Sequence, residues 1–350
     1  MGGVYVLYGG CSDSIRIDKD TLSQQKKGGV VMEYRKLIKF GNSSFVLSLP
    51  KGWVEKNNLS KGDLIYIAEN GNSELMLSAR NGADQKVRLQ EISINIDSKS
   101  FSDIKREIVS AYIRNVHVIN VEGKHLDKKV REIREFMSNL MALEIVEHNG
   151  NKIVAKDFLN MKNISLFQAI KKIDAVVRGM LQDSQQIFET DTYQSLMVRD
   201  EDVNRLVNMV LRVSRYALRK PSLVQNAGLA PFDFFKYLQV ADGLERIADE
   251  VKRLSRYLRK LEITDIMKQE ILLLYKDLHQ QYEQVMEAFY SNDLQKAFEC
   301  ASKDQALRER CDALAGVEQK NGTGQYLSTI AEKFKTMDYC IHSIGREVYQ

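Results

Sequence analysis

The chain has 350 residues, of which 44% are hydrophobic and 28% charged, a composition typical of globular proteins with hydrophobic cores. No run approaches the roughly 18 apolar residues of a membrane-spanning helix, so we expect no membrane insertion and a cytoplasmic protein. A net charge of +4 favours nucleic-acid binding only slightly. The four cysteines have no C-x-x-C spacing, which argues against a zinc site and against disulfides.

The first 31 residues contain six of the twenty glycines and show no sustained periodicity. We therefore expect residues 1–31 to be a disordered leader. A sharper interpretation is that translation starts at Met32, because Lys26 to Val30 would be encoded by A- and G-rich codons, as a ribosome-binding site would be.

Residues 32–82 are predicted to form a small β-rich domain. Strands are expected at Arg35 to Phe40, Ser44 to Leu49, Leu64 to Ile67 and Leu75 to Leu77. Gly41-Asn42-Ser43 has the residues of a turn, and Pro50 suits the first turn of a short helix. Because so short a segment with one short helix makes a poor core, we expect this domain to dimerise.

Residues 86–160 alternate strand and helix patterns, which predicts a compact α/β sandwich. The expected strands are Ile92 to Ile96, Val116 to Val121, Leu143 to Glu147 and Lys152 to Lys156. Asn149-Gly150 joins the last two as a hairpin, and Ser102 is the expected N-cap of the first helix. No motif in this domain indicates its role.

From Ser165 onward, apolar residues recur at helical spacing and predict six long helices, the fifth near Leu294 to Ala315. Helices of this kind pack as antiparallel bundles. The six resemble one three-helix unit repeated twice, at residues 165–261 and 262–350. The repeat aligns Asp200 with Asp304 and Asp249 with Asp338.

The third of these helices has three carboxylates on one face, Asp242, Glu245 and Asp249. Like charges at this spacing repel by a few tenths of a kcal/mol, which Arg246 and Lys252 or a bound metal can offset. Asp200 on the preceding helix can face them across the bundle, and carboxylates suit iron, manganese or magnesium. A solvated acidic face with ion pairs and a metal site both remain open.

Leu244 to Asp249 resembles the helix motif of the PhoU family of phosphate-uptake regulators, in which Glu or Asp and an Asp four residues later bind a metal cluster. Asp200 to Asn204 resembles the partner motif, although Asn204 stands where the family usually has Asp. The resemblance extends from Ser165 to Gln350 and implies a metal ion in the first bundle. The implied metal ligands are Asp200, Asn204, Glu245 and Asp249. The second copy departs further, with Arg308 four residues after Asp304 and Phe334 four residues before Asp338.

Arg35 to Ser43, Leu49-Pro50-Lys51 and Lys61-Gly62-Asp63 resemble the AbrB/SpoVT swapped-hairpin DNA-binding domain. That resemblance implies an intertwined homodimer on double-stranded DNA. The implied DNA-binding residues are Arg35, Lys36, Lys39, Asn42, Ser43 and Lys51. The basic side chains would neutralise phosphates while the turn residues reach the groove edges. The alternative is a domain that only dimerises, with solvated basic residues.

The expected fold is multidomain α+β: a swapped-hairpin β domain, a middle α/β sandwich and an all-α C-terminal pair of three-helix bundles. An AbrB-like domain joined to a PhoU-like region is an arrangement of archaeal phosphate regulators, which implies a homodimeric, DNA-binding transcriptional regulator of phosphate uptake. The alternative is an adaptor that does not bind DNA and acts on a phosphate transporter or sensor kinase. An enzyme is not expected, because nucleotide-binding and H-E-x-x-H motifs are absent and the five histidines lie far apart.

Overall fold

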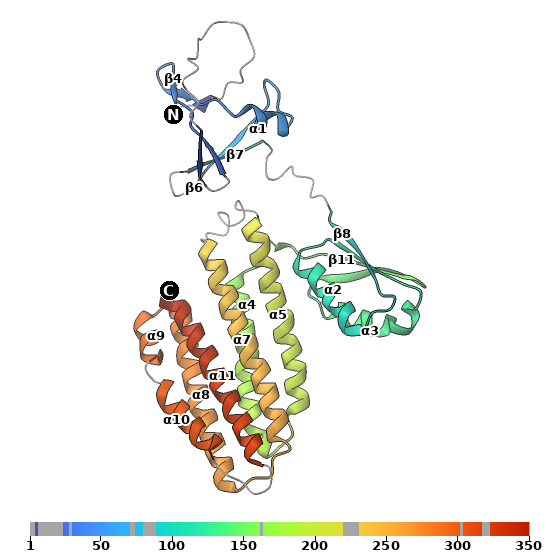
Figure 1. Ribbon diagram of the computed structural model, residues 1–350, viewed down its shortest axis with the longest axis vertical. Helices are drawn as coiled ribbons and strands as arrows, with labels where there is room; N and C mark the ends of the chain where they lie inside the picture. The colour runs from blue at the N-terminus through green and yellow to red at the C-terminus, as the bar shows by residue number, and fades with distance from the viewer. Residues whose placement is uncertain are drawn as a thin grey trace. The chain divides into compact units, whose positions relative to one another are not determined.

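The computed structural model describes residues 4–5, 24–27, 30–70, 74–79, 89–161, 164–219, 231–301, 304–316 and 323–349. The fold is α+β with a helical C-terminal region (Figure 1). The chain divides into two compact units, Met1–Arg88 and Leu89–Gln350. Among the described helices, none combines the length and apolar character needed to span a membrane.

The described residues 30–79 form the head of the protein. Its elements are β3 (Val30–Glu33), β4 (Ile38–Phe40), β5 (Ser44–Val46), α1 (Lys51–Lys56), β6 (Tyr66–Asn70) and β7 (Glu74–Ser78). Strands β4 and β5 pair antiparallel, and β6 and β7 form a second antiparallel hairpin. Gly41 begins the β4–β5 turn with a φ of 67°, a backbone conformation that glycine adopts without strain. The predicted turn and all four predicted strands are present, but with different bounds. Strand β4 begins three residues after Arg35, β5 ends at Val46 rather than Leu49, and β6 begins at Tyr66 rather than Leu64.

Two described stretches of the expected leader are paired in strands. Strand β1 (Val4–Tyr5) pairs parallel with β5, and β2 (Gln24–Lys27) pairs antiparallel with β3. At these two places the chain therefore has regular structure where a disordered leader was expected. The other leader residues lie outside the described ranges, and the translation start at Met32 stays a prediction.

Residues 89–161 contain a four-stranded sheet and two helices (Figure 1). The strands are β8 (Glu91–Asn95), β9 (Val118–Glu122), β10 (Leu143–Asn149) and β11 (Lys152–Asp157), in the order β10-β11-β9-β8. The helices α2 (Phe101–Ile113) and α3 (Leu126–Ser138) share a hydrophobic core with the sheet. The N-cap of α2 is Ser100, whose hydroxyl accepts the Asp103 backbone N–H at 3.2 Å. Ser102, the predicted cap, lies inside the first turn because the helix begins at Phe101.

The helical region has one continuous hydrophobic core that extends from Leu166 to Val348. Its helices are α4 (Leu166–Gln185), α5 (Tyr193–Arg219), α7 (Pro231–Leu258), α8 (Asp265–Ser291), α9 (Leu294–Ala301), α10 (Asp304–Ala315) and α11 (Thr323–Tyr349). Helix α7 packs against α4, α5 and α11, and α11 also packs against α8, α9 and α10 (Figure 1). The predicted fifth helix is therefore two helices, and the two predicted repeats share a core across the contact of α7 with α11.

A buried arginine of α5 joins the helical region to the sheet domain. Arg212 has no exposed surface, and its guanidinium lies 2.5 Å from a carboxylate oxygen of Asp157 at the end of β11. Its Nε also donates to the side-chain oxygen of Asn115 at 3.0 Å. The guanidinium stacks 3.9 Å from the centroid of the Tyr112 ring. One side chain thus provides an ion pair, a hydrogen bond and a cation–π contact at this joint.

The Arg212→Leu variant should lose about 3–5 kcal/mol of stability, because Asp157 would remain buried without its cationic partner. Urea unfolding of the full chain, followed by circular dichroism, measures the loss. The matched control is Arg205→Leu on the same helix, whose ion pair with Asp202 at 3.2 Å is exposed. That control should change stability by less than about 1 kcal/mol. Equal losses in the two variants would show that Arg212 has no special role at the joint.

Candidate functional site

Four of the predicted DNA-binding residues lie in or beside the β4–β5 hairpin. Lys39 is in β4, paired with Phe45, and Asn42 and Ser43 lie in the turn. Lys36 precedes β4 by two residues. All four predicted residues are exposed. Lys36 and Lys39 form no hydrogen bond or ion pair with another described residue, which leaves both ammonium groups available to an anionic partner.

The other two predicted residues differ in their surroundings. Arg35 is half-buried and has an interaction partner within the protein. Lys51 is exposed at the start of α1 and forms an ion pair of 3.5 Å with Glu55 one turn later. Such an exposed i,i+4 pair contributes only about 0.3–0.5 kcal/mol, so Glu55 is a weak competitor for a phosphate at Lys51.

The head exposes most of its apolar side chains. Among its residues with described side chains, the buried hydrophobic ones are Val46 and Val54. The exposed large apolar side chains are Tyr34, Leu37, Ile38, Phe40, Phe45, Leu64, Tyr66, Ile67, Leu75 and Met76. Apolar surface gathered on so small a unit indicates a contact surface rather than a solvated one.

The predicted metal-binding carboxylates Asp200 on α5 and Asp249 on α7 are brought together around a lysine. The Nζ atom of Lys252 lies 2.5 Å from Asp200 Oδ2 and 2.7 Å from Asp249 Oδ1. Burial alone lowers the pKa of the Lys252 ammonium, but its hydrogen bonds to Asp200 and Asp249 more than offset that effect and raise the pKa. The ammonium group therefore stays charged and neutralises the two carboxylates.

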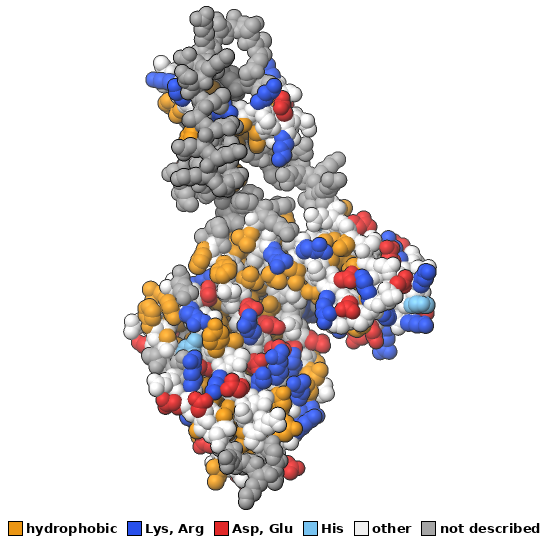
Figure 2. All heavy atoms as spheres, in the orientation of Figure 1, with side chains coloured by type: hydrophobic (Ala, Val, Ile, Leu, Met, Phe, Trp, Pro, Cys, Tyr) orange, Lys and Arg blue, Asp and Glu red, His pale blue; other side chains and the backbone are white. Residues whose placement is uncertain are grey.

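Neighbouring basic side chains also pair with Asp242 and Asp249 on the acidic face. Arg246 pairs with Asp242 at 2.9 Å, and Arg253 pairs with Asp249 at 2.6 Å. Figure 2 shows Lys and Arg side chains interspersed with Asp and Glu side chains over this region. These ion pairs thus offset the repulsion between the like-charged carboxylates of α7.

Glu245 is the carboxylate of this face without a basic partner of its own. It is half-buried and forms no hydrogen bond or ion pair with another described residue. Burial raises the pKa of Glu245, and the nearby carboxylates of Asp249, Asp242 and Asp200 raise it further. Sequence spacing placed Glu245 with Asp249, but it gave no sign of this unmatched charge.

The positions of Asp200, Asn204 and Asp249 suit an ammonium group better than a metal ion. The amide nitrogen of Asn204 lies 3.3 Å from Asp200 Oδ2 and donates to it. Within the described part of the chain, no group of three or more His, Cys, Asp or Glu side chains is arranged to hold a metal ion. An ion between Asp200 and Asp249 would have to displace Lys252. The binding of iron, manganese or magnesium here stays a prediction.

Buried acids also face basic side chains in residues 262–350, the second predicted repeat. Asp338 on α11 is fully buried, and the Nε atom of Arg308 on α10 lies 3.5 Å from its Oδ2. The Nε2 atom of His342 lies 3.3 Å from the other carboxylate oxygen. A second ion pair that the sequence did not indicate joins Lys333 on α11 to the buried Glu250 on α7 at 2.9 Å. Basic side chains thus face the buried acids Asp200, Glu250 and Asp338.

Comparison of the chain with protein-family models gives no match, and comparison with curated proteins gives no significant match. The resemblances to the PhoU and AbrB/SpoVT families therefore rest on the motifs themselves.

The Lys252→Met variant should lose about 1–3 kcal/mol of stability, because it leaves the buried Asp200 without its charged donor. Chemical unfolding of the full chain measures this change. Lys268→Met is the matched control, since Lys268 pairs at 3.2 Å with Asp265, whose side chain is 92% exposed. The control should change stability by less than about 1 kcal/mol.

Elemental analysis of the same preparations completes this test. Stoichiometric iron, manganese or magnesium in the wild type that disappears in a Glu245→Ala/Asp249→Ala variant would show that a metal ion replaces Lys252 between the carboxylates. In that case, Lys252→Met should not destabilise the metal-loaded protein.

Proposed function

We propose that the protein is a homodimeric regulator located in the cytoplasm. It binds double-stranded DNA through its head and controls phosphate uptake. The observation that supports DNA binding is the pair of exposed lysines, Lys36 and Lys39, free of ion pairs with described residues beside the exposed turn at Asn42 and Ser43. Exposed lysines without ion pairs can replace the counterions of DNA phosphates, and exposed turn residues can reach base edges.

Dimerisation is the part of the proposal that the exposed apolar surface of the head supports. A second copy can cover side chains such as Leu64 and Leu75, which are 75% and 62% exposed in the single chain. Two-fold symmetry would also double the number of free lysines that face the duplex. If the two copies exchanged their β4–β5 and β6–β7 hairpins, the exchange would cover the apolar side chains and also bring the lysines of both copies together.

The link to phosphate rests on the resemblance of the helical region to the PhoU family. In this proposal the helical region reports phosphate status through partner proteins, such as a phosphate transporter or a sensor kinase. Exposed aromatic side chains at the start of α7 and on α9, namely Phe232, Phe235 and Phe298, favour a protein partner. The same observation supports the adaptor alternative, in which the head only dimerises.

Changing Lys36 and Lys39 together to Ala should weaken DNA binding and flatten its salt dependence. The slope of log affinity against log salt should fall by about 0.9 for each DNA phosphate that the variant no longer neutralises. Gel retardation at several salt concentrations, with promoter DNA of phosphate-transport genes, measures both quantities. Asn42→Ala should instead reduce sequence preference more than total affinity, if the side chain reads a base edge.

The control for this experiment is Lys128→Ala/Arg131→Ala, which removes two charges from exposed positions of α3, outside the head. That variant should bind DNA as the wild type does. A folded dimer that binds no DNA at low salt would favour the adaptor function. Equal weakening by both double variants would show that binding follows net charge rather than the hairpin.

The protein should sediment at about twice its chain mass of 40.2 kDa at micromolar concentration. Leu64→Glu should shift it toward the monomer, because the dimer would bury that side chain and a buried unpaired carboxylate is costly. Val198→Glu is the control, since Val198 lies on α5 with 63% exposure and plays no part in the head. A monomeric wild type would rule out the swapped-hairpin arrangement.

A further inference from the structure

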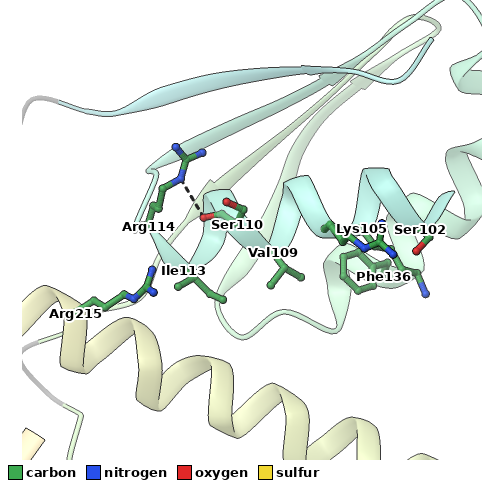
Figure 3. A pocket seen from close by; sticks show the side chains of 9 residues that line it. Ser102, Lys105, Val109, Ser110, Ile113, Arg114, Phe136 and Arg215 are labelled. Carbon is green, nitrogen blue, oxygen red and sulfur yellow. Dashed lines mark hydrogen bonds between the residues drawn. The ribbon is translucent and has the colours of Figure 1, made fainter. Parts of the chain in front are cut away.

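A groove of about 560 Å³ lies between α2 and α5, beside the joint made by Arg212 (Figure 3). Its volume is within the range of about 300–1,000 Å³ that is typical of small-molecule sites. Residues of the outer face of α2 form most of it, Phe136 of α3 closes one end, and Arg215 of α5 faces the other. None of the nine lining residues is acidic, whereas four are basic.

Two arginines at one end of the groove have free donors. Arg114 donates through Nε to the backbone carbonyl of Ser110 at 3.2 Å, which leaves its two terminal nitrogens unused. Arg215 is exposed and forms no hydrogen bond or ion pair with another described residue. Figure 3 shows the two side chains at the same end, one from the end of α2 and the other from α5. Two exposed guanidinium groups at the same end of a groove suit the oxygens of a phosphate.

The remainder of the groove is apolar. Val109 and Ile113 form its floor between the arginines and the Phe136 ring (Figure 3). At the far end, Lys105 Nζ lies 5.0 Å from the centroid of the Phe136 ring, in a cation–π contact. A ligand that matches both parts therefore has an anionic group at one end and an apolar body behind it.

We propose that this groove binds an organic phosphate monoester. Its phosphate lies between Arg114 and Arg215, and its apolar body covers Val109, Ile113 and Phe136. Two guanidinium groups at one end of the groove, with no carboxylate among the lining residues, favour a dianion over a monoanion, and the volume exceeds what inorganic phosphate fills. The groove shares no residue with the head, so binding of a ligand there does not depend on DNA binding by the head.

A ligand bound in this way would strengthen the joint between the sheet domain and the helical region. Arg114 caps the C-terminus of α2, and Arg215 follows Arg212 on α5 by three residues, about one helical turn. A phosphate held by both arginines would add a second link beside the Arg212–Asp157 ion pair. Ligand binding at this site would thus make the connection between the sheet domain and the helical region more rigid.

Calorimetric titration of the full chain tests this assignment with three probes: 1-naphthyl phosphate, 1-naphthol and inorganic phosphate. The first should bind, 1-naphthol should not bind measurably, and inorganic phosphate should bind at least tenfold more weakly than the ester. Arg114→Ala and Arg215→Ala should each weaken the binding of 1-naphthyl phosphate by about tenfold, as expected when one charge-assisted hydrogen bond is removed.

Arg131→Ala, on α3 and outside the groove, is the charge-matched control and should leave affinity unchanged. Val109→Glu should abolish binding, because it places a carboxylate on the floor, and it keeps the test informative if an arginine variant misfolds. Equal binding of 1-naphthol and the ester would overturn the proposal. So would full affinity in the arginine variants or in Val109→Glu, and so would equal affinity for inorganic phosphate and the ester.

Discussion

The described residues of the head bury little apolar surface by themselves, and the proposed function depends on this constraint. Between residues 34 and 79, Val46 and Val54 are the buried hydrophobic side chains among those described, and the two hairpins expose most of their other large apolar side chains. Hydrophobic burial is the main favourable term in folding, so a second copy is the simplest way to complete this unit. The same pairing would place two copies of Lys36 and Lys39 on one surface. Stability of the head and its affinity for DNA would then have the same origin.

Buried charges organise the helical unit, where acids pair with bases from other elements. Lys252 on α7 neutralises Asp200 on α5, and Arg212 on α5 neutralises Asp157 at the end of β11. Removing one partner of such a pair costs far more than the pair contributes net, so these contacts fix how the elements align. Lys252 lies between the carboxylates of Asp200 and Asp249. The carboxylates of the acidic face therefore form ion pairs, with the exception of Glu245.

Much of this fold could be predicted from sequence where burial follows a period. The apolar stripes predicted the helices α4, α5, α7, α8 and α11, because each buries one continuous face. Strand ends were less accurate, since β4 begins at Ile38, the first residue with a partner in β5, and pairing is not visible in one strand. The burial of Arg212 could not be predicted either. An arginine on an amphipathic helix is expected to be exposed, and its partners Asp157 and Asn115 come from distant segments. Lys252 was visible three residues from Asp249, but its contact with Asp200 depends on helix packing.

DNA contact by the head, through the β4–β5 hairpin, is the central proposal. Hydrogen exchange of the full chain, with and without a short duplex at low salt, tests it most directly because exchange is resolved by peptide. We predict that peptides covering residues 34–50 become protected when the duplex is added, and that Lys36→Ala/Lys39→Ala removes this protection. Protection confined to the helical region, or none in a folded dimer at saturating DNA, would contradict the claim.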